Sequence, residues 1–100
     1  MIIYSITFAI DDTVEQEWIE WTKNHYIGKI MDIGLFNDYR FSKTHPSTEV
    51  ETAYNIQFRC ASLTHIELFE KQHAPAINER MIEKYRGKFG SFKLVLEEIE

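Results

Sequence analysis

The sequence is poor in the residues that usually mark disulfide-stabilised, metal-binding or phosphate-binding domains. It has one cysteine, two prolines and four scattered glycines in 100 residues. A single cysteine, Cys60, can form neither an internal disulfide nor a thiolate zinc site. Its alternation with Tyr54, Ile56 and Phe58 predicts a buried, inert thiol. No glycine-rich phosphate loop, CxxC, HExxH or paired-carboxylate motif is present. We therefore expect no metal and no cofactor.

Positive charge and long hydrophobic runs are also scarce. Sixteen acidic residues stand against 11 basic ones, a net charge of −5, and this balance disfavours binding to nucleic acid, which needs a basic patch. The apolar start MIIYSITFAI lacks the basic segment and cleavage site of a signal peptide. No run approaches the roughly 20 apolar residues of a membrane span. The sequence predicts a cytoplasmic protein with neither nucleic-acid nor membrane partners.

What the chain does contain is typical of a packed globule. Hydrophobic residues make up 44% and aromatic residues 14%, which is unlike a disordered chain. We expect one domain over residues 1–100. A chain this short buries a small fraction of its surface alone, and oligomerisation is a common way to bury more.

Hydrophobic periodicity predicts the order of the elements. Residues 2–10 alternate as a half-buried strand does. A helix is expected over Val14–Asp32, capped near Thr13, loosened near Gly28 and ended by Gly34. Strands follow over 35–43 and 52–60, separated by a loop over 44–51. The second helix should break at His73–Ala74 and restart on Pro75, and a last strand should run from residue 89 to 99.

This order, β-α-β-β-α-β, is that of ferredoxin-like α+β domains, in which two helices cover one face of a four-stranded antiparallel sheet. We expect the apolar stripes of the strands, among them Phe92, Leu94 and Leu96, to lie under the helices. The other face would carry small and polar residues, with Phe36, Asp38, Arg40 and Lys93 among them. It is either a solvated sheet face or the surface through which two copies form a homodimer around a polar interior.

Short stretches spread over the whole chain carry a resemblance to a known family. They are MIIYSITFAIDD, the tryptophans at 18 and 21, IMDIGLF, YRF, AYNIQF, EKQHAPAI and FKLVLEE. Together they resemble a family of short bacterial proteins known as a domain of unknown function, of the dimeric α/β-barrel, ferredoxin-like type. The resemblance implies this fold and a homodimer with facing sheets, and it implies no activity. Where this chain has Tyr26-Ile27-Gly28, we expect a His-Ile-Pro-like turn in such relatives.

The first helix carries the first group of candidate ligand-binding residues. Trp18, Trp21 and His25 follow Val14 at spacings of four, three and four, so they would share one helical face. They would line an aromatic pocket with a titratable group at one end, together with Tyr26 at the departing turn. The alternative is that they form the core stripe of the helix.

Three further candidates lie elsewhere in the chain. His73, just before the proline break, would either satisfy a free carbonyl at a helix end or act as a base. A metal site built from His25 and His73 lacks a third ligand. Arg40 and Gln57 would converge on a small anion at the open sheet face. The alternative for the arginines of that face is cross-strand pairing with Asp38 and neighbouring acids.

These patterns lead to three functional hypotheses. The first is a homodimeric module that binds a small anionic or aromatic molecule, or regulates through it, without catalysis. The second is a cofactor-independent monooxygenase or isomerase of the dimeric α/β-barrel type, which rests on analogy of fold. The third is a structural protein-interaction module.

Overall fold

The computed structural model of the chain describes residues 1–45 and 52–100. In chain order its elements are β1 (Ile2–Ile10), a 3₁₀ turn η1 (Asp12–Val14), α1 (Glu15–Trp21), a π-helical turn η2 (Thr22–Tyr26), α2 (Ile27–Asp32), β2 (Asp38–Thr44), β3 (Ala53–Cys60), α3 (Leu63–Gln72), α4 (Ala74–Tyr85) and β4 (Phe89–Glu97). The predicted β-α-β-β-α-β order is confirmed. The predicted loop over 44–51 falls mainly on residues 46–51, which lie outside the described residues.

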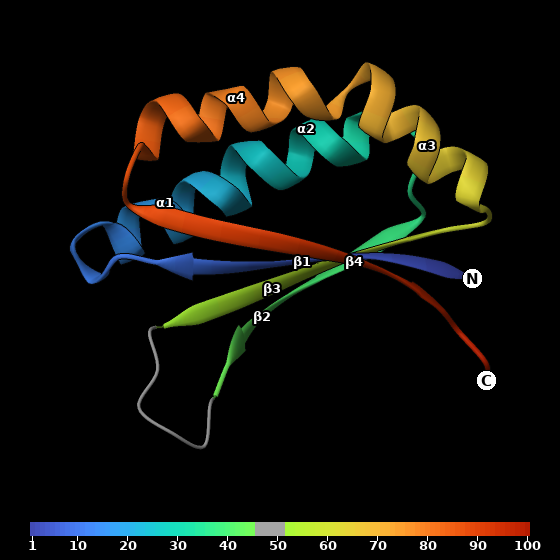
Figure 1. Cartoon of the computed structure of the whole chain (residues 1–100), viewed down its shortest axis with the longest axis horizontal. Coiled ribbons are helices and arrows are strands. Elements are labelled where there is room, and N and C mark those ends of the chain that lie inside the picture. The colour runs from blue at the N-terminus through green and yellow to red at the C-terminus, as the bar shows by residue number, and fades with distance from the viewer. Residues whose placement is uncertain (46–51) are drawn as a thin grey trace.

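The four strands form one antiparallel sheet in the order β2-β3-β1-β4. The two helical segments, α1 to α2 and α3 to α4, lie side by side over one face of this sheet, and none of the described helices lies on the opposite face (Figure 1). The protein therefore has the ferredoxin-like α+β fold. None of the helices in residues 1–45 and 52–100 is both long and apolar enough to cross a bilayer.

The core lies between the helices and the two central strands, β1 and β3. Their side chains alternate, so every second residue is buried against the helices, as the sequence predicted. This buried set is Ile2, Tyr4, Ile6, Phe8, Ile10, Tyr54, Ile56, Phe58 and Cys60. Cys60 is the buried free thiol that its place in the alternation predicted. Apolar burial of this kind is the main favourable term in folding.

A π-helical turn sets which face of the first helical segment is buried. The buried residues of this segment are Trp18, Thr22, Tyr26, Ile27 and Ile30. Four of them recur at a spacing of four, which drifts around an α-helix of 3.6 residues per turn. The wider turn η2 absorbs the difference, and the N–H group of Ile27 donates to the carbonyl of Thr22. His25 is exposed, so it does not lie on one face with the buried Trp18, and the alternative in which it belongs to the core stripe is wrong. The loosening lies at 22–26 instead of Gly28.

The ends of the helices follow local chemistry. Asp11, and not Thr13, provides the first cap: its carboxylate accepts a 2.9 Å hydrogen bond from the Thr13 N–H group. Gly34 follows α2 with a φ of +86°, in the left-handed region where glycine is unstrained. The second helical segment breaks at His73, with Pro75 in the first turn of α4, as predicted.

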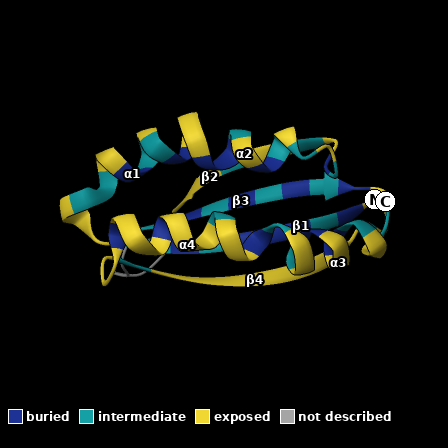
Figure 2. Cartoon of the chain, turned by 90° about the horizontal axis from the view of Figure 1, so that it is seen from above, coloured by how far each residue is buried: buried dark blue, intermediate teal, exposed yellow. Residues whose placement is uncertain are grey.

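The edge strand β4 faces the opposite way from the prediction. Its pairing with β1 aligns Ser91 with Phe8 and Lys93 with Ile6, so these two side chains lie on the helix side. Phe92, Leu94 and Leu96 lie on the open face, where they are 60%, 54% and 40% exposed. Strand β4 is exposed along nearly its whole length, and α4 lies over β1 and to one side of β4 (Figure 2).

A second correction concerns Phe36, which was expected on the open face. It precedes β2 and lies in the core, 5% exposed. Its ring lies 5.3 Å from that of Phe58 and 5.4 Å from that of Phe69, measured between centroids. Strand β2 begins three residues later than predicted. Phe36 therefore does not follow the alternation of the strand, and its side chain packs beneath the helices.

Candidate functional site

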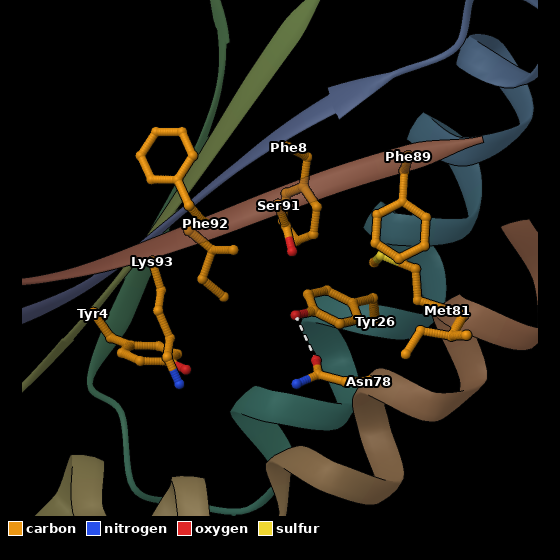
Figure 3. A pocket seen from close by; sticks show the side chains of 11 residues that line it. Tyr4, Phe8, Tyr26, Asn78, Met81, Phe89, Ser91, Phe92 and Lys93 are labelled. Carbon is orange, nitrogen blue, oxygen red and sulfur yellow. Dashed lines mark hydrogen bonds between the residues drawn. The ribbon is translucent and has the colours of Figure 1, made fainter. Parts of the chain in front are cut away.

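A cavity of about 370 Å³ lies beneath the edge strand, between β1 and β4 on one side and the π-helical turn η2 and α4 on the other (Figure 3). We call it the strand cavity. It exists because the helices cover β1 but stop short of β4. Its walls are mainly aromatic and aliphatic, and the residues that line it are Tyr4, Ile6, Phe8, Tyr26, Asn78, Met81, Ile82, Phe89, Ser91, Phe92 and Lys93.

Hydroxyl and amide groups reach the strand cavity from opposite walls. The Tyr26 hydroxyl, on the helix side, donates a 3.4 Å hydrogen bond to the Asn78 side-chain oxygen of α4. Figure 3 shows this hydroxyl and that of Ser91 pointing toward the middle of the cavity, while the Phe92 ring points to the other side of β4. The Tyr26 bond is long for an O–H···O hydrogen bond. A ligand oxygen that accepts a hydrogen bond from the Tyr26 hydroxyl would therefore replace a weak bond to Asn78.

The only charged group in the lining of the strand cavity is neutralised within the chain. The Lys93 ammonium group forms an ion pair with the Glu70 carboxylate of α3. The same carboxylate accepts a 3.1 Å hydrogen bond from the Tyr4 hydroxyl. The end of the cavity at Tyr4 and Lys93 is thus polar but close to zero net charge.

Burial keeps the tyrosines of the cavity protonated. It raises the pKa of Tyr26 well above its ordinary value. It likewise raises the pKa of Tyr4, and the neighbouring Glu70 carboxylate adds to that shift. Removing a phenol proton in a poorly hydrated site would leave a charge without solvation. At neutral pH both hydroxyls are therefore hydrogen-bond donors and neither is a base.

A second hollow, the helix groove, lies on the outer side of the helix layer and has a volume of about 450 Å³. It brings together three of the residues predicted from the sequence, Trp21, His25 and Tyr26. Trp21 is half-buried there, with its ring centroid 6.0 Å from that of Tyr26 and 5.7 Å from that of Tyr85. The remaining lining residues are Lys29, Ala76, Ile77 and Arg80.

The other predicted residues lie apart from both hollows. Arg40 and Gln57 are direct neighbours across β2 and β3 on the open face, as expected. His73 is half-buried at the break between α3 and α4. Neither the strand cavity nor the helix groove includes any of these three residues. Within residues 1–45 and 52–100, no three His, Cys, Asp or Glu side chains are grouped as metal ligands would be.

The predicted pairing of open-face arginines holds for Arg59. Its guanidinium group binds both carboxylate oxygens of Asp38 at 2.8 Å and lies 3.3 Å from Glu98. On the same face the Asn55 amide donates to the hydroxyls of Ser5 and Thr7. The half of the open face formed by β2 and β3 is therefore polar, and the half along β4 is apolar.

Sequence reasoning found Tyr26 but missed most of the strand cavity. Ser91 and Lys93 were assigned to the open face because the alternation in β4 has its larger apolar residues at 92, 94 and 96. Tyr4 was placed in the core, correctly, but nothing in the sequence pairs it with Glu70. No local signal reveals a cavity that arises from the helices ending short of an edge strand.

Comparison with solved structures identifies others with the same fold. An ethyl tert-butyl ether d (EthD) family protein from Bacillus halodurans has a TM-score of 0.74 and 12% identity, with 99% of this chain and 100% of that chain covered. HapK from Hahella chejuensis also gives 0.74, at 8% identity, with coverages of 99% and 93%. A putative antibiotic biosynthesis monooxygenase from Bacillus cereus gives 0.60 at 12% identity, with coverages of 99% and 95%. At these identities the likeness shows the fold alone.

At the level of sequence, one family model accounts for nearly the whole chain. A model described as a domain of unknown function, DUF4286, matches residues 1–99. No protein with a curated description matches the sequence.

Proposed function

The chain belongs to the DUF4286 family, a domain of unknown function, and from this premise we propose that it is a homodimeric module that binds a small uncharged molecule without catalysis. The strand cavity is the ligand site. We also place the protein in the cytoplasm, since its one cysteine is a buried free thiol of the kind that suits a reducing compartment.

The chemistry of the strand cavity carries this proposal. Its volume of about 370 Å³ falls in the range of small-molecule sites, roughly 300–1,000 Å³. Protonated tyrosine and serine hydroxyls face an otherwise apolar space, and the single cation in the lining is paired with Glu70. A flat, largely apolar ligand with one or two oxygen acceptors fits such a site, because it leaves no charge unpaired on burial.

Binding is favoured over catalysis by what the lining side chains can do. An oxygenase or isomerase without a cofactor needs a base that removes a proton from its substrate near neutral pH. The lining of the strand cavity, as far as the structure describes it, includes no histidine, cysteine or free carboxylate. The tyrosines cannot serve, because burial raises the pKa of each.

The exposed stripe on β4 supports the homodimer. Phe92, Leu94 and Leu96 share the open face with the half-buried Ile3 of β1, directly opposite Leu96. A long apolar edge strand invites association unless it is covered. In a homodimer, the apolar stripe of a second copy would cover the apolar stripe of the first. The polar half of each sheet, around Arg40 and Gln57, would then lie at the ends or in the interior of the interface. Sheet-to-sheet association would also bury additional apolar surface, of which a chain this short buries little by itself.

Binding of naphthol, a neutral phenol of suitable size, tests the ligand proposal by calorimetry. Ser91→Leu should weaken binding, because it places a larger apolar side chain in the cavity and removes a hydroxyl. Tyr26→Phe removes one hydroxyl and should weaken binding about 3- to 10-fold, the value of one hydrogen bond. Its matched control, Tyr39→Phe, removes an exposed hydroxyl on β2 and should leave the affinity unchanged, as should Arg40→Ala and His73→Ala.

Two results would overturn the proposal. Equal affinities of wild type and Ser91→Leu would place the ligand outside the strand cavity. Conversion of naphthol during aerobic incubation, followed by NMR of the recovered compound, would show that the protein is an enzyme.

A further inference from the structure

The helix groove is a local exception to the negative charge of the chain. The protein carries a net charge of −5, yet the charged and titratable residues that line the groove are Lys29, Arg80 and His25, with no carboxylate among them. Across the part of the chain that the structure describes, none of these three forms an ion pair within 4.0 Å.

The cations stand around an apolar floor. Trp21 and Ile77 are both half-buried and pack against the core, one from each helical segment, with Ala76 beside them. The π-helical turn η2 brings about this arrangement, because it rotates Thr22 and Tyr26 into the core and leaves Trp21 and His25 toward α4. Turns of this kind occur frequently at functional sites.

The nearest acids limit where negative charge would be accepted. Glu79 and Glu83 line the adjoining hollow further along α4, together with Lys84 and Arg80. Lys84 is engaged with Glu17 at 3.7 Å. Arg80 lines both hollows, whereas Lys29 lines the helix groove and not the hollow that contains the glutamates. Negative charge is therefore favoured most at the Lys29 end of the helix groove, with Arg80 beside it.

We propose that the helix groove is a second binding site, separate from the strand cavity, for a small aromatic anion such as an aromatic carboxylate. The ring lies on the floor formed by Trp21 and Ile77, and the negative group pairs with Lys29 and Arg80. A guanidinium group binds a carboxylate through two parallel hydrogen bonds, and an aromatic ring adds stacking on an indole. The two sites differ in the charge that they accept, and they share Tyr26 as a common wall.

Binding of naphthoate, compared with its neutral amide naphthamide, tests this site by NMR titration of the backbone amides. Naphthoate should shift amides around Trp21, Lys29 and Ile77, and it should bind at least about fivefold more tightly than naphthamide, the effect of one or two exposed ion pairs. Its affinity should fall as salt concentration rises.

The double variant Lys29→Gln/Arg80→Gln should reduce the naphthoate affinity to that of naphthamide. Its matched control is Lys71→Gln/Arg86→Gln, which removes the same charges from exposed positions outside the groove and should leave the affinity unchanged. Circular dichroism establishes that both variants are folded.

Ser91→Leu separates this proposal from the previous one, because it narrows the strand cavity, does not touch the helix groove and should leave naphthoate binding intact. Equal affinities for naphthoate and naphthamide would overturn the proposal, as would equal losses in the two double variants. Amide shifts confined to β4 would overturn it too, since they would place the anion in the strand cavity.

Discussion

Replacing Leu94 with lysine tests whether the open face of the sheet joins two copies of the protein. Leu94 lies in the middle of the apolar stripe on β4 and is 54% exposed. If a second copy covers this stripe, Leu94→Lys removes apolar area from the interface and brings an ammonium group into it. The dimer should therefore dissociate at concentrations where the wild type is dimeric.

The magnitude follows from the exposed fraction. Burying a leucine side chain completely contributes about 1.5–3 kcal/mol, so covering the exposed 54% contributes about 0.8–1.6 kcal/mol in each copy. A symmetric dimer loses this twice, about 1.6–3.2 kcal/mol. At 1.4 kcal/mol for each factor of ten, the dissociation constant should rise about 15- to 200-fold from lost burial alone. Desolvation of the two ammonium groups increases the effect.

Val95→Lys is the matched control, because Val95 is the next residue of the same strand and is 46% exposed on the helix side. Sedimentation equilibrium of both variants and of the wild type measures the dissociation constants. Val95→Lys should remain dimeric while Leu94→Lys becomes monomeric. A wild type that is monomeric at high micromolar concentration would refute the homodimer. Equal dissociation constants for the two variants would show that the open face is not the interface.

Three further predictions concern stability and ionisation. Gly34→Ala should lower the free energy of unfolding by about 1–2 kcal/mol because φ is +86° there, whereas Gly28→Ala, with open space at its Cβ position, should raise it by about 0.5–1 kcal/mol; urea denaturation that gave both the same sign would contradict this. Phe58→Ala, fully buried, should cost about 3–5 kcal/mol in the same assay, and a cost under about 1 kcal/mol would mean that this part of the core is not packed as described. Burial and the Glu15 carboxylate raise the pKa of Tyr54 from 10.0 to about 12, so its contribution to stability is present below pH 10 and is lost as the pH rises toward 12; in an absorbance titration Glu15→Gln should lower this pKa, and no change would remove Glu15 as a cause.

Prediction from the sequence succeeded where neighbouring residues alone determine the local structure. The alternation of β1 and β3 predicted the buried set correctly, because both strands are central and one face of each must be covered by helices. Pro75 predicted the break at His73, since its ring cannot continue the hydrogen bonds of a preceding helix. Gly34 predicted the end of α2 for a similarly local reason.

Prediction failed where the deciding contact is distant in the sequence. The apolar residues Phe92, Leu94 and Leu96 looked like an inward stripe, but β4 is an edge strand that the helices leave largely exposed. Its direction is therefore set by its register with β1. The phase of the first helical segment also depends on packing, because the π-helical turn keeps Trp18, Thr22, Tyr26 and Ile30 on the buried face. An amphipathic pattern read with a period of 3.6 put His25 on the wrong side.

The candidate sites also differ in how far the sequence could predict them. Trp21, His25 and Tyr26 could be named from one helical segment, and the structure brings them together in the helix groove. The strand cavity could not be named, because Tyr4, Tyr26, Asn78 and Ser91 come from four different elements. Its neutrality depends on the ion pair between Lys93 and Glu70, two residues that no local pattern connects.

By itself the sequence determined the order of the elements, the ferredoxin-like topology and the core of the two central strands. These depend on hydrophobic period, turn chemistry and proline, which act over a few neighbouring residues. Only the tertiary structure decided which face of β4 is open, where the helices leave a cavity and which charges are paired. Those features depend on register and on how far one layer extends over another, and both are settled when distant segments of the chain pack together.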